Sequence, residues 1–477
     1  MLRTHRGAAR TGLAILAVLA FALLGPTSAG AATIKVTTVD DELNDDSDCS
    51  LREAVQAANT NKAVSGCEKG QRAKRDTIQL RTKTYNLTIP STDEDLNANG
   101  DLDHTGGGAL TIRGPEVPAV INAPAHDRAL EATSGATALK LQRLTLVGDD
   151  VSELPGTGNE WGGTLKVVGP SLALTRALVV EGLARVGGGL YLVSDRPLLI
   201  DRTTFSYNDA INGAGMHAFG DGSATITRSI FHDNEALSGA ARGGAITTSM
   251  ERTTITDTLI RNNTTSSAPG GSSLGAGIYA AAGGLVVRRS LIAENRAEET
   301  GDTVGAGGGG ISAGGVNRIS NTTFHDNFSA DEGGGFAGEA KLSHVTFLAN
   351  QADDPGDHVH GDGDGVVLRN SLLPGAQIAV DLCAGAVTSK GFSAATYDDP
   401  GCGFLDSDVF GAVALVPGGP ADNGGATNTV AIRASSIAKD LVPKAKCKVA
   451  KGEDQRGFER PKGERCDAGA FERGAQP

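Results

Sequence analysis

A short motif that ends in asparagine recurs six times between Gly187 and Asn350, and this repeat constrains the fold more than any other feature. The six asparagines are Asn208, Asn234, Asn263, Asn295, Asn327 and Asn350. The last glycine of a glycine-rich turn precedes each asparagine by 15–19 residues, and 7–15 residues separate each asparagine from the next such glycine. A segment of nearly constant length that alternates with a variable one predicts a solenoid whose loops lie on one edge.

The constant segments have the composition of β-strands. Runs such as ATITRSIF and KLSHVTF alternate and are rich in Thr, Ile, Val and Phe. A Phe or Ile stands three residues before each asparagine, and we expect these side chains to stack in the interior: Phe205, Phe231, Ile260, Ile292, Phe324 and Phe347. The sequence therefore predicts an all-β fold, a parallel β-helix with two or three short strands in each coil.

The recurring asparagine marks a corner of the coil. Asn and Gly tolerate positive φ better than other residues, so we expect the asparagine itself to adopt that conformation. Two weaker copies, QRLTLVGD and TRALVVEG, end in Asp149 and Gly182. This substitution pattern favours a structural role for the position over a catalytic one.

Residues 1–32 are typical of a secretory signal peptide. Three arginines precede the apolar run TGLAILAVLAFALLG, and small residues follow it. Without this segment the chain has 40 basic residues, because three of the 43 are removed, against 56 acidic ones, a net charge of −16. Such a charge argues against nucleic-acid binding, and no second long apolar run predicts a membrane span. We expect a secreted or cell-surface protein that is monomeric.

Six cysteines fit an exported protein. They fall as three neighbouring pairs separated by 18, 19 and 19 residues: Cys49 and Cys67, Cys383 and Cys402, Cys447 and Cys466. Six cysteines allow fifteen connectivities, and pairing between neighbours is favoured because it brackets the ends of the chain. A metal cluster is the weaker alternative, since no Cys-x-x-Cys spacing occurs.

The two ends of the chain differ from the repeat. Residues 33–90 predict an N-terminal cap: a strand, then a helix in CSLREAVQAAN in which Ser50 and Glu53 have capping-box spacing. Residues 91–379 are predicted to form the β-helix. Residues 380–477 are rich in turns, and we expect a C-terminal cap stapled by disulfides. Arg456, Arg460, Asp467 and Glu472 are interpreted as structural ion pairs within it.

Two segments resemble a known family of secreted bacterial proteins. DCSLREAVQAAN resembles the CSLREA signature, and PGGPADNGGATNT, DQRGFERP and CDAGAFE resemble the choice-of-anchor Q region that accompanies it. The resemblance implies a right-handed parallel β-helix of the pectin-lyase-like type, exported to the cell surface or the medium. It implies no established enzymatic activity.

Residues 93–104, DEDLNANGDLDH, share the spacing of a calcium-binding loop with Gly100 at its sharp turn. The candidate ligands are Asp95, Asn97, Asn99, Asp101 and Asp103. The twelfth position is Gly106 in place of the usual glutamate, so an acidic turn without metal is the alternative. No other cofactor is predicted.

Long variable loops are the favoured functional sites, because loops carry recognition on a rigid scaffold. Three of them are long: 150–162, 264–276 and 296–309. The first contains Trp161, the only tryptophan, which is a candidate to stack on a sugar ring or to pack against the sheet. The predicted function is non-enzymatic: adhesion, or contact with glycans or matrix.

The alternative is a divergent polysaccharide lyase or glycoside hydrolase, because β-helices host such enzymes. The set of motifs of a galacturonase, Asn-Thr-Asp, Asp-Asp, Gly-His-Gly and Arg-Ile-Lys on successive coils, is not found. The acidic pairs, such as Asp149-Asp150, do not by themselves place an acid and a base on either side of a scissile bond. His358 and His360 are a weak candidate metal pair. No catalytic residue is assigned from the sequence.

Overall fold

The structure is a computed structural model, and it describes residues 31–72, 74–90, 95–123, 125–153, 159–299, 306–375, 381–448 and 452–476. The chain divides into two units, Met1–Gly30 and Ala31–Pro477, and only the second is described here. The predicted signal peptide therefore lies almost wholly outside the described residues. None of the helices among those residues is long and apolar enough to cross a membrane.

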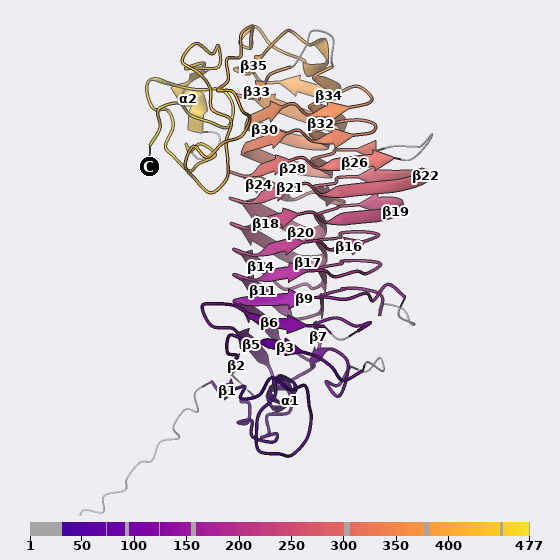
Figure 1. The fold of residues 1–477 in the computed structure, drawn as a ribbon. Helices are drawn as coiled ribbons and strands as arrows, with labels where there is room; N and C mark the ends of the chain where they lie inside the picture. Colours follow the sequence, from indigo (N-terminus) through magenta and orange to yellow (C-terminus); the bar gives the residue numbers. More distant parts are fainter. Residues whose placement is uncertain are drawn as a thin grey trace, which may run out of the picture. The chain divides into compact units, whose positions relative to one another are not determined.

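The repeat folds into coils of three strands that stack in parallel (Figure 1). In one coil these are β13 (Leu190–Val193), β14 (Leu198–Asp201) and β15 (Thr204–Ser206). Each strand pairs in register with the equivalent strand one coil later: Leu190 with Met216, Leu198 with Ala224, and Thr204 with Ile230. The predicted parallel β-helix is confirmed, with three faces that run along its axis.

The strands are named by face. Face 1 contains β4 (Leu102–His104), β7 (Leu130–Ala132), β10 (Leu165–Val168), β13, β23 (Ile278–Ala280) and the first parts of β17 (Met216–Thr227), β20 (Ile246–Thr256), β28 (Ile311–His325), β30 (Phe336–Leu348), β32 (Val359–Arg369) and β34 (Cys383–Ser389). Face 2 contains β1 (Thr33–Lys35), β2 (Arg75–Gln79), β5 (Ala109–Arg113), β8 (Ala138–Gln142), β11 (Ser171–Thr175), β14, β24 (Leu285–Arg288) and the later parts of the same long strands. Face 3 contains β3 (Thr84–Asn86), β6 (Ala119–Asn122), β9 (Leu144–Val147), β12 (Leu178–Val180), β15, β18 (Ile230–His232), β21 (Leu259–Arg261), β25 (Leu291–Ala293), the ends of β28 and β30, β33 (Leu372–Leu373), β35 (Ala394–Ala395) and β36 (Val409–Phe410).

The variable segments form a second sheet, which the sequence did not predict. Its strands are β16 (Asp209–Ala210), β19 (Glu235–Arg242), β22 (Thr264–Leu274), β26 (Arg296–Glu299), β27 (Ala306–Gly307), β29 (Phe328–Ser329) and β31 (Gln351–Ala352). They project from one edge of the coils (Figure 1), as expected, but they are paired strands and not loops. Stacking brings their backbone N–H and C=O groups to strand spacing, where pairing satisfies them. We call this sheet the flap.

The interior column predicted from the repeat is confirmed. Its six side chains pair in sequence from coil to coil: Phe205, Phe231, Ile260, Ile292, Phe324 and Phe347. All are fully buried. The rings of Phe205 and Phe231 stack with centroids 4.7 Å apart, and those of Phe324 and Phe347 with centroids 4.9 Å apart. Burial of large apolar side chains at one level of every coil supplies a continuous core.

The predicted reason for the asparagines is wrong. The residue with positive φ is the one before each asparagine, for example Asp233 at 55° and Asn262 at 51°. The asparagine side chain is buried and forms a hydrogen-bonded ladder, in which the Nδ2 of Asn234 donates to the Oδ1 of Asn263 at 2.8 Å. The Nδ2 of Asn263 in turn donates to the Oδ1 of Asn295 at 2.9 Å. An amide that both donates and accepts along the axis explains why asparagine recurs.

Disulfides staple both ends of the β-helix. The three neighbouring pairs are bonded as favoured: Cys49–Cys67, Cys383–Cys402 and Cys447–Cys466. The first lies beside the helix α1 (Leu51–Thr60), which begins with the predicted capping box. The second joins β34 to the short helix η1 (Pro400–Cys402). The third joins α2 (Lys444–Cys447) to β38 (Arg465–Cys466), which pairs with β37 (Val442–Pro443). Disulfides fit an oxidising compartment.

The C-terminal cap returns to cover face 3. The side chain of Gln455 accepts a hydrogen bond from Thr323 at 2.6 Å, and the backbone of Ala470 donates to Thr346 at 2.9 Å. Glu453 pairs with Arg289 at 2.7 Å. These contacts tie residues 453–470 to coils that precede them by more than a hundred residues.

The charged residues within this cap are structural, although they bond differently from the prediction. Arg460 donates to the carbonyls of Gly469 and Ala470, and Glu472 accepts from backbone N–H groups. Arg456 does form an ion pair, but with Asp454 at 2.6 Å. The four predicted residues therefore secure turns of the cap mainly through the backbone.

Candidate functional site

One row of side chains points outward along face 1, and it contains carboxylates, a lysine, two tyrosines and two histidines. Consecutive coils place these residues side by side in register: Asp103, Glu131, Lys166, Tyr191, His217, Thr247, Tyr279, Ser312, Ala337 and His360. Neighbouring members are about 4.8 Å apart, the spacing of paired strands. We call this row the outer ladder.

The middle of the outer ladder is aromatic. Trp161 packs on Tyr191 with ring centroids 4.8 Å apart, and Tyr191 stacks on His217 at 5.9 Å. Phe219 meets the rings of both Tyr191 and His217 edge-on at 5.8 Å. Tyr279 lies two coils beyond His217. Aromatic residues make up only 4% of the chain, so this grouping is a distinct feature of the surface. We call Trp161, Tyr191, His217, Phe219 and Tyr279 the aromatic patch.

The aromatic patch is uncharged at neutral pH. Burial raises the pKa of the Tyr191 hydroxyl to about 12, so it stays protonated. Burial also lowers the pKa of His217 to about 4, so its imidazole stays neutral. The flap supplies a polar border: the guanidinium of Arg242, at the end of β19, lies 5.4 Å from the centroid of the Tyr279 ring. Tyr191 is buried beneath its neighbours, whereas Trp161, His217, Phe219 and Tyr279 are partly exposed. Neutral, partly exposed rings beside a charged border can contact an amphipathic ligand.

Trp161 is the one member of the patch that the sequence singled out. Its backbone bridges to Val186, and that column continues through Asn212 to Arg242 at the edge of the flap. The side chain is partly exposed and packs on Tyr191. This contact agrees with packing against the sheet, one of the two roles expected for Trp161. A signal for the others was present in the sequence. Tyr191, His217 and Tyr279 each stand two residues after the last glycine of a glycine-rich turn.

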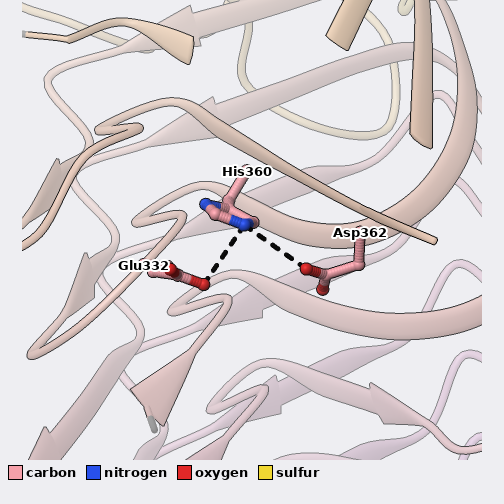
Figure 2. Close-up of side chains that lie close together, drawn as sticks. All are labelled: Glu332, His360 and Asp362. Atoms are coloured by element: carbon pink, nitrogen blue, oxygen red, sulfur yellow. Dashed lines mark ion pairs between the residues drawn. The ribbon is translucent and has the colours of Figure 1, made fainter. Parts of the chain in front are cut away.

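A cluster of three ionisable side chains lies near the far end of the outer ladder. Figure 2 shows the imidazole of His360 between the carboxylates of Glu332 and Asp362. The Nε2 of His360 lies 3.2 Å from the Oε2 of Glu332 and 3.3 Å from the Oδ1 of Asp362. The His360 side chain is 14% exposed, whereas the two carboxylates are open to solvent. This arrangement can hold a proton between an imidazole and a carboxylate at the protein surface.

His358 does not join this cluster. It is buried inside the coil, where its ring stacks on Phe347 with centroids 5.7 Å apart. His358 points into the coil and His360 points outward. The two imidazoles therefore do not form the weak metal pair considered from the sequence. Burial lowers the pKa of His358 to about 4.

The predicted calcium loop lies at the opposite end of the outer ladder. Asn97 is buried, and its side chain donates to the carbonyl of Arg52 at 2.9 Å and accepts from the backbone of Asp103 at 3.2 Å. The carbonyl of Asn99 accepts from Arg52 at 3.2 Å. Both asparagines thus contribute groups that hold the loop together. The oxygens that converge belong to Asp95, Asp103 and Glu131, and they lie within 4.8 Å of one another.

The cap creates a separate groove on face 3, with a volume of about 410 Å³. Its apolar floor contains Ile230, Leu259, Leu291 and Ala293, and cap residues Gly418, Pro420 and Ala426 to Asn428 close one side. Two charged groups on its border are already paired, Arg228 with Asp201 and Asp257 with Arg289. No feature of the sequence predicts this groove, because it exists only when the cap folds back on face 3.

The comparisons with known proteins bear on the fold. Residues 183–373 match a family model described as right handed beta helix region. Among solved structures, the chain is similar to one described as pectate lyase Pel9A, with 13% sequence identity and a TM-score of 0.42 over 93% of this chain and 98% of that one. Comparison with curated proteins gave no significant match. The segment that carries the asparagine repeat thus matches the right-handed β-helix family, and the chain folds as a right-handed parallel β-helix.

Proposed function

We propose that this protein binds a polysaccharide chain along face 1, with the aromatic patch as its principal contact. The observation that carries the proposal is the grouping of Trp161, Tyr191 and His217 on three consecutive coils, with Tyr279 two coils beyond His217. Aromatic rings combine a broad apolar face with little conformational entropy to lose, which suits the apolar faces of sugar rings. Rings spread over several coils of one face suit a ligand that is itself an extended chain.

Charge and architecture support the same proposal. The patch is neutral and the flap borders it with polar groups such as Arg242, so the surface offers both stacking and hydrogen bonding. Its position on paired strands makes it rigid, which reduces the entropic cost of binding. On this basis we propose a non-enzymatic role in adhesion or in matrix binding.

The proposal predicts that loss of a ring weakens binding. We expect Trp161→Ala and Tyr279→Ala each to raise the Kd for the bound polysaccharide about tenfold, which corresponds to roughly 1.4 kcal/mol. Affinity electrophoresis in gels that contain individual soluble polysaccharides measures this for both variants. In the wild type, the fluorescence of the single tryptophan gives a second reading.

Tyr207→Ala is the matched control. Tyr207 is 59% exposed and follows β15 on face 3, so its removal deletes a surface ring outside the patch. It is expected to bind as the wild type does. Equal weakening by all three substitutions, or no retardation of the wild type by any acidic or neutral polysaccharide, contradicts the proposal.

We further propose that the protein is exported and belongs with the CSLREA and choice-of-anchor Q proteins. Residues 1–32 have the composition of a signal peptide, and three disulfides support an oxidising destination. The SLRE segment of the signature has defined roles that support this placement. Ser50 and Glu53 cap α1, while Arg52 is buried and pairs with Asp41 at 2.7 Å. The final location, cell surface or medium, follows from fractionation of the producing cells.

A second candidate function is cleavage of the bound polysaccharide, and the cluster of Glu332, His360 and Asp362 favours it. These groups lie on the same face as the aromatic patch and pair an imidazole with carboxylates, as general acid–base catalysis requires. If the protein cleaves its ligand, reducing ends or unsaturated uronates appear on incubation. His360→Ala should then lower the rate by a factor of about 10²–10⁴ without changing retention in affinity electrophoresis. Wild-type protein that generates neither product excludes this candidate.

A further inference from the structure

The N-terminal end of the outer ladder carries an excess of buried negative charge. Asp103 and Glu131 are paired directly across neighbouring strands β4 and β7, and both are buried. Like charges placed opposite each other in a sheet destabilise it. Asp101 and Asp127 are buried beside them. A fold that keeps four carboxylates together in this way needs compensating cations.

The protein supplies only part of that compensation among the described residues. Arg128 lies 3.0 Å from Glu131 and 3.5 Å from Asp101, and Lys166 lies 3.0 Å from Glu131. Both cations contact the same oxygen of Glu131, Oε2. Four buried carboxyl groups thus share two basic side chains among the described residues.

Asp101 gives an independent sign of a missing partner. Its side chain is 3% exposed, yet its Oδ2 receives no hydrogen bond, and the guanidinium of Arg128 remains 3.5 Å away. A buried carboxylate oxygen without a donor is costly unless a cation is nearby.

The neighbouring oxygens have the spacing of a metal site. One carboxylate oxygen each from Asp95, Asp103 and Glu131 lie within 4.8 Å of one another. A calcium ion binds oxygens at about 2.3–2.6 Å, so two of its ligands on opposite sides are at most about 5 Å apart. An all-oxygen set of carboxylates favours calcium over zinc or copper, which prefer nitrogen or sulfur ligands. Calcium also tolerates irregular geometry better than magnesium.

The loop that presents these groups is held in place by the N-terminal cap. Arg52, from α1, donates to the carbonyls of Asn99, Gly100 and Asp101 at 3.2, 2.6 and 2.8 Å. Asn97 bonds to Arg52 and Asp103, as described above. These bonds fix the path of the chain between Asn97 and Asp103. A site whose ligands are already positioned loses little entropy on binding a metal.

We propose that Asp95, Asp103 and Glu131 bind one calcium ion beside the carboxylate of Asp101. The ion neutralises the buried charge and links the acidic loop to the first coils of the β-helix. This set differs from the one that the sequence suggested, because Glu131 replaces Asn97 and Asn99 as a ligand. The inference is independent of polysaccharide binding at the aromatic patch.

Calorimetric titration of the purified full-length chain with calcium tests the proposal. We expect a Kd on the order of 10⁻⁴–10⁻³ M, the range of extracellular modules. Asp95→Asn should weaken binding at least tenfold, and because Asp95 is exposed the variant retains the fold. Glu131→Gln should weaken it as well. Glu251→Gln, which removes an exposed carboxylate from β20, is the matched control and should bind as the wild type does.

Thermal unfolding gives a second, independent reading. The Tm of the wild type should be higher in millimolar calcium than in chelator, since an ion bound by the folded state alone stabilises it. The difference should shrink in Asp95→Asn and persist in Glu251→Gln. Three results overturn the proposal: equal Tm values for the wild type in calcium and chelator, unchanged affinity in both ligand variants, or magnesium binding as tight as calcium binding.

Discussion

Replacing Phe231 with alanine is expected to lower the free energy of unfolding by about 3–5 kcal/mol. The ring is fully buried and lies between Phe205, 4.7 Å away, and Ile260 of the next coil. Its removal leaves a cavity, and the neighbours in the column are held by strand pairing on both sides, so they cannot collapse into it. Urea unfolding followed by circular dichroism measures the loss.

Ile230→Ala is the control for this experiment. Ile230 is the neighbour of Phe231 on β18, but its side chain points outward and is 37% exposed. Its replacement should cost no more than about 1 kcal/mol, because much of the apolar surface is already in water. A loss below 1 kcal/mol for Phe231→Ala would mean that the ring is not part of a packed column.

Asn263→Ala should destabilise the protein by about 3–6 kcal/mol, because it breaks the ladder in its middle. The Nδ2 of Asn263 donates to the carbonyls of Phe231 and Arg261 and to the Oδ1 of Asn295. Its Oδ1 accepts from the backbone and the side chain of Asn234. Alanine leaves several of these buried groups without a partner, and each costs about 1–3 kcal/mol. The same urea unfolding experiment gives the value.

Asn262→Gly distinguishes the contribution of the asparagine ladder from that of the corner conformation. Asn262 is exposed and has a φ of 51°, so glycine fits its backbone without strain. This variant should unfold within about 1 kcal/mol of the wild type. If instead Asn262→Gly is the more damaging of the two, then the corner conformation, and not the ladder, explains the repeated asparagine.

The periodic features of the fold were predictable from the sequence because each is repeated. Six copies of a Phe or Ile at a fixed distance from an asparagine indicate a stacked interior, and Phe205 to Phe347 do form that column. Pairing between neighbouring cysteines was favoured because the three pairs bracket the ends of the chain, and Cys49 is indeed bonded to Cys67. The physical role of the asparagine was misjudged. The tolerance of asparagine for positive φ is a property of the residue type and is known from the sequence. A hydrogen-bonded ladder of side chains can be recognised only when neighbouring coils are aligned.

Contacts between distant residues escaped prediction. Glu131 reaches Asp103 only because two coils stack in register, and no spacing in the sequence signals that meeting. The aromatic patch was missed likewise, since Tyr191 and Tyr279 are 88 residues apart and look isolated. The flap was taken for loops because strands such as TTSSAPGGSSL in β22 have little β-propensity of their own. Their pairing is imposed by the coils beneath.

The return of residues 453–470 to face 3 sets an order of events in folding. A stack of coils can form progressively as the chain becomes available, since each coil contacts its neighbours. The coils that carry Arg289, Thr323 and Thr346 are different, because their outer surface is completed by Glu453, Gln455 and Ala470. As the chain is synthesised, these coils must wait for more than a hundred further residues before their outer surface is covered. The C-terminal segment therefore completes the packing on face 3, and a chain that ends before it leaves part of face 3 exposed.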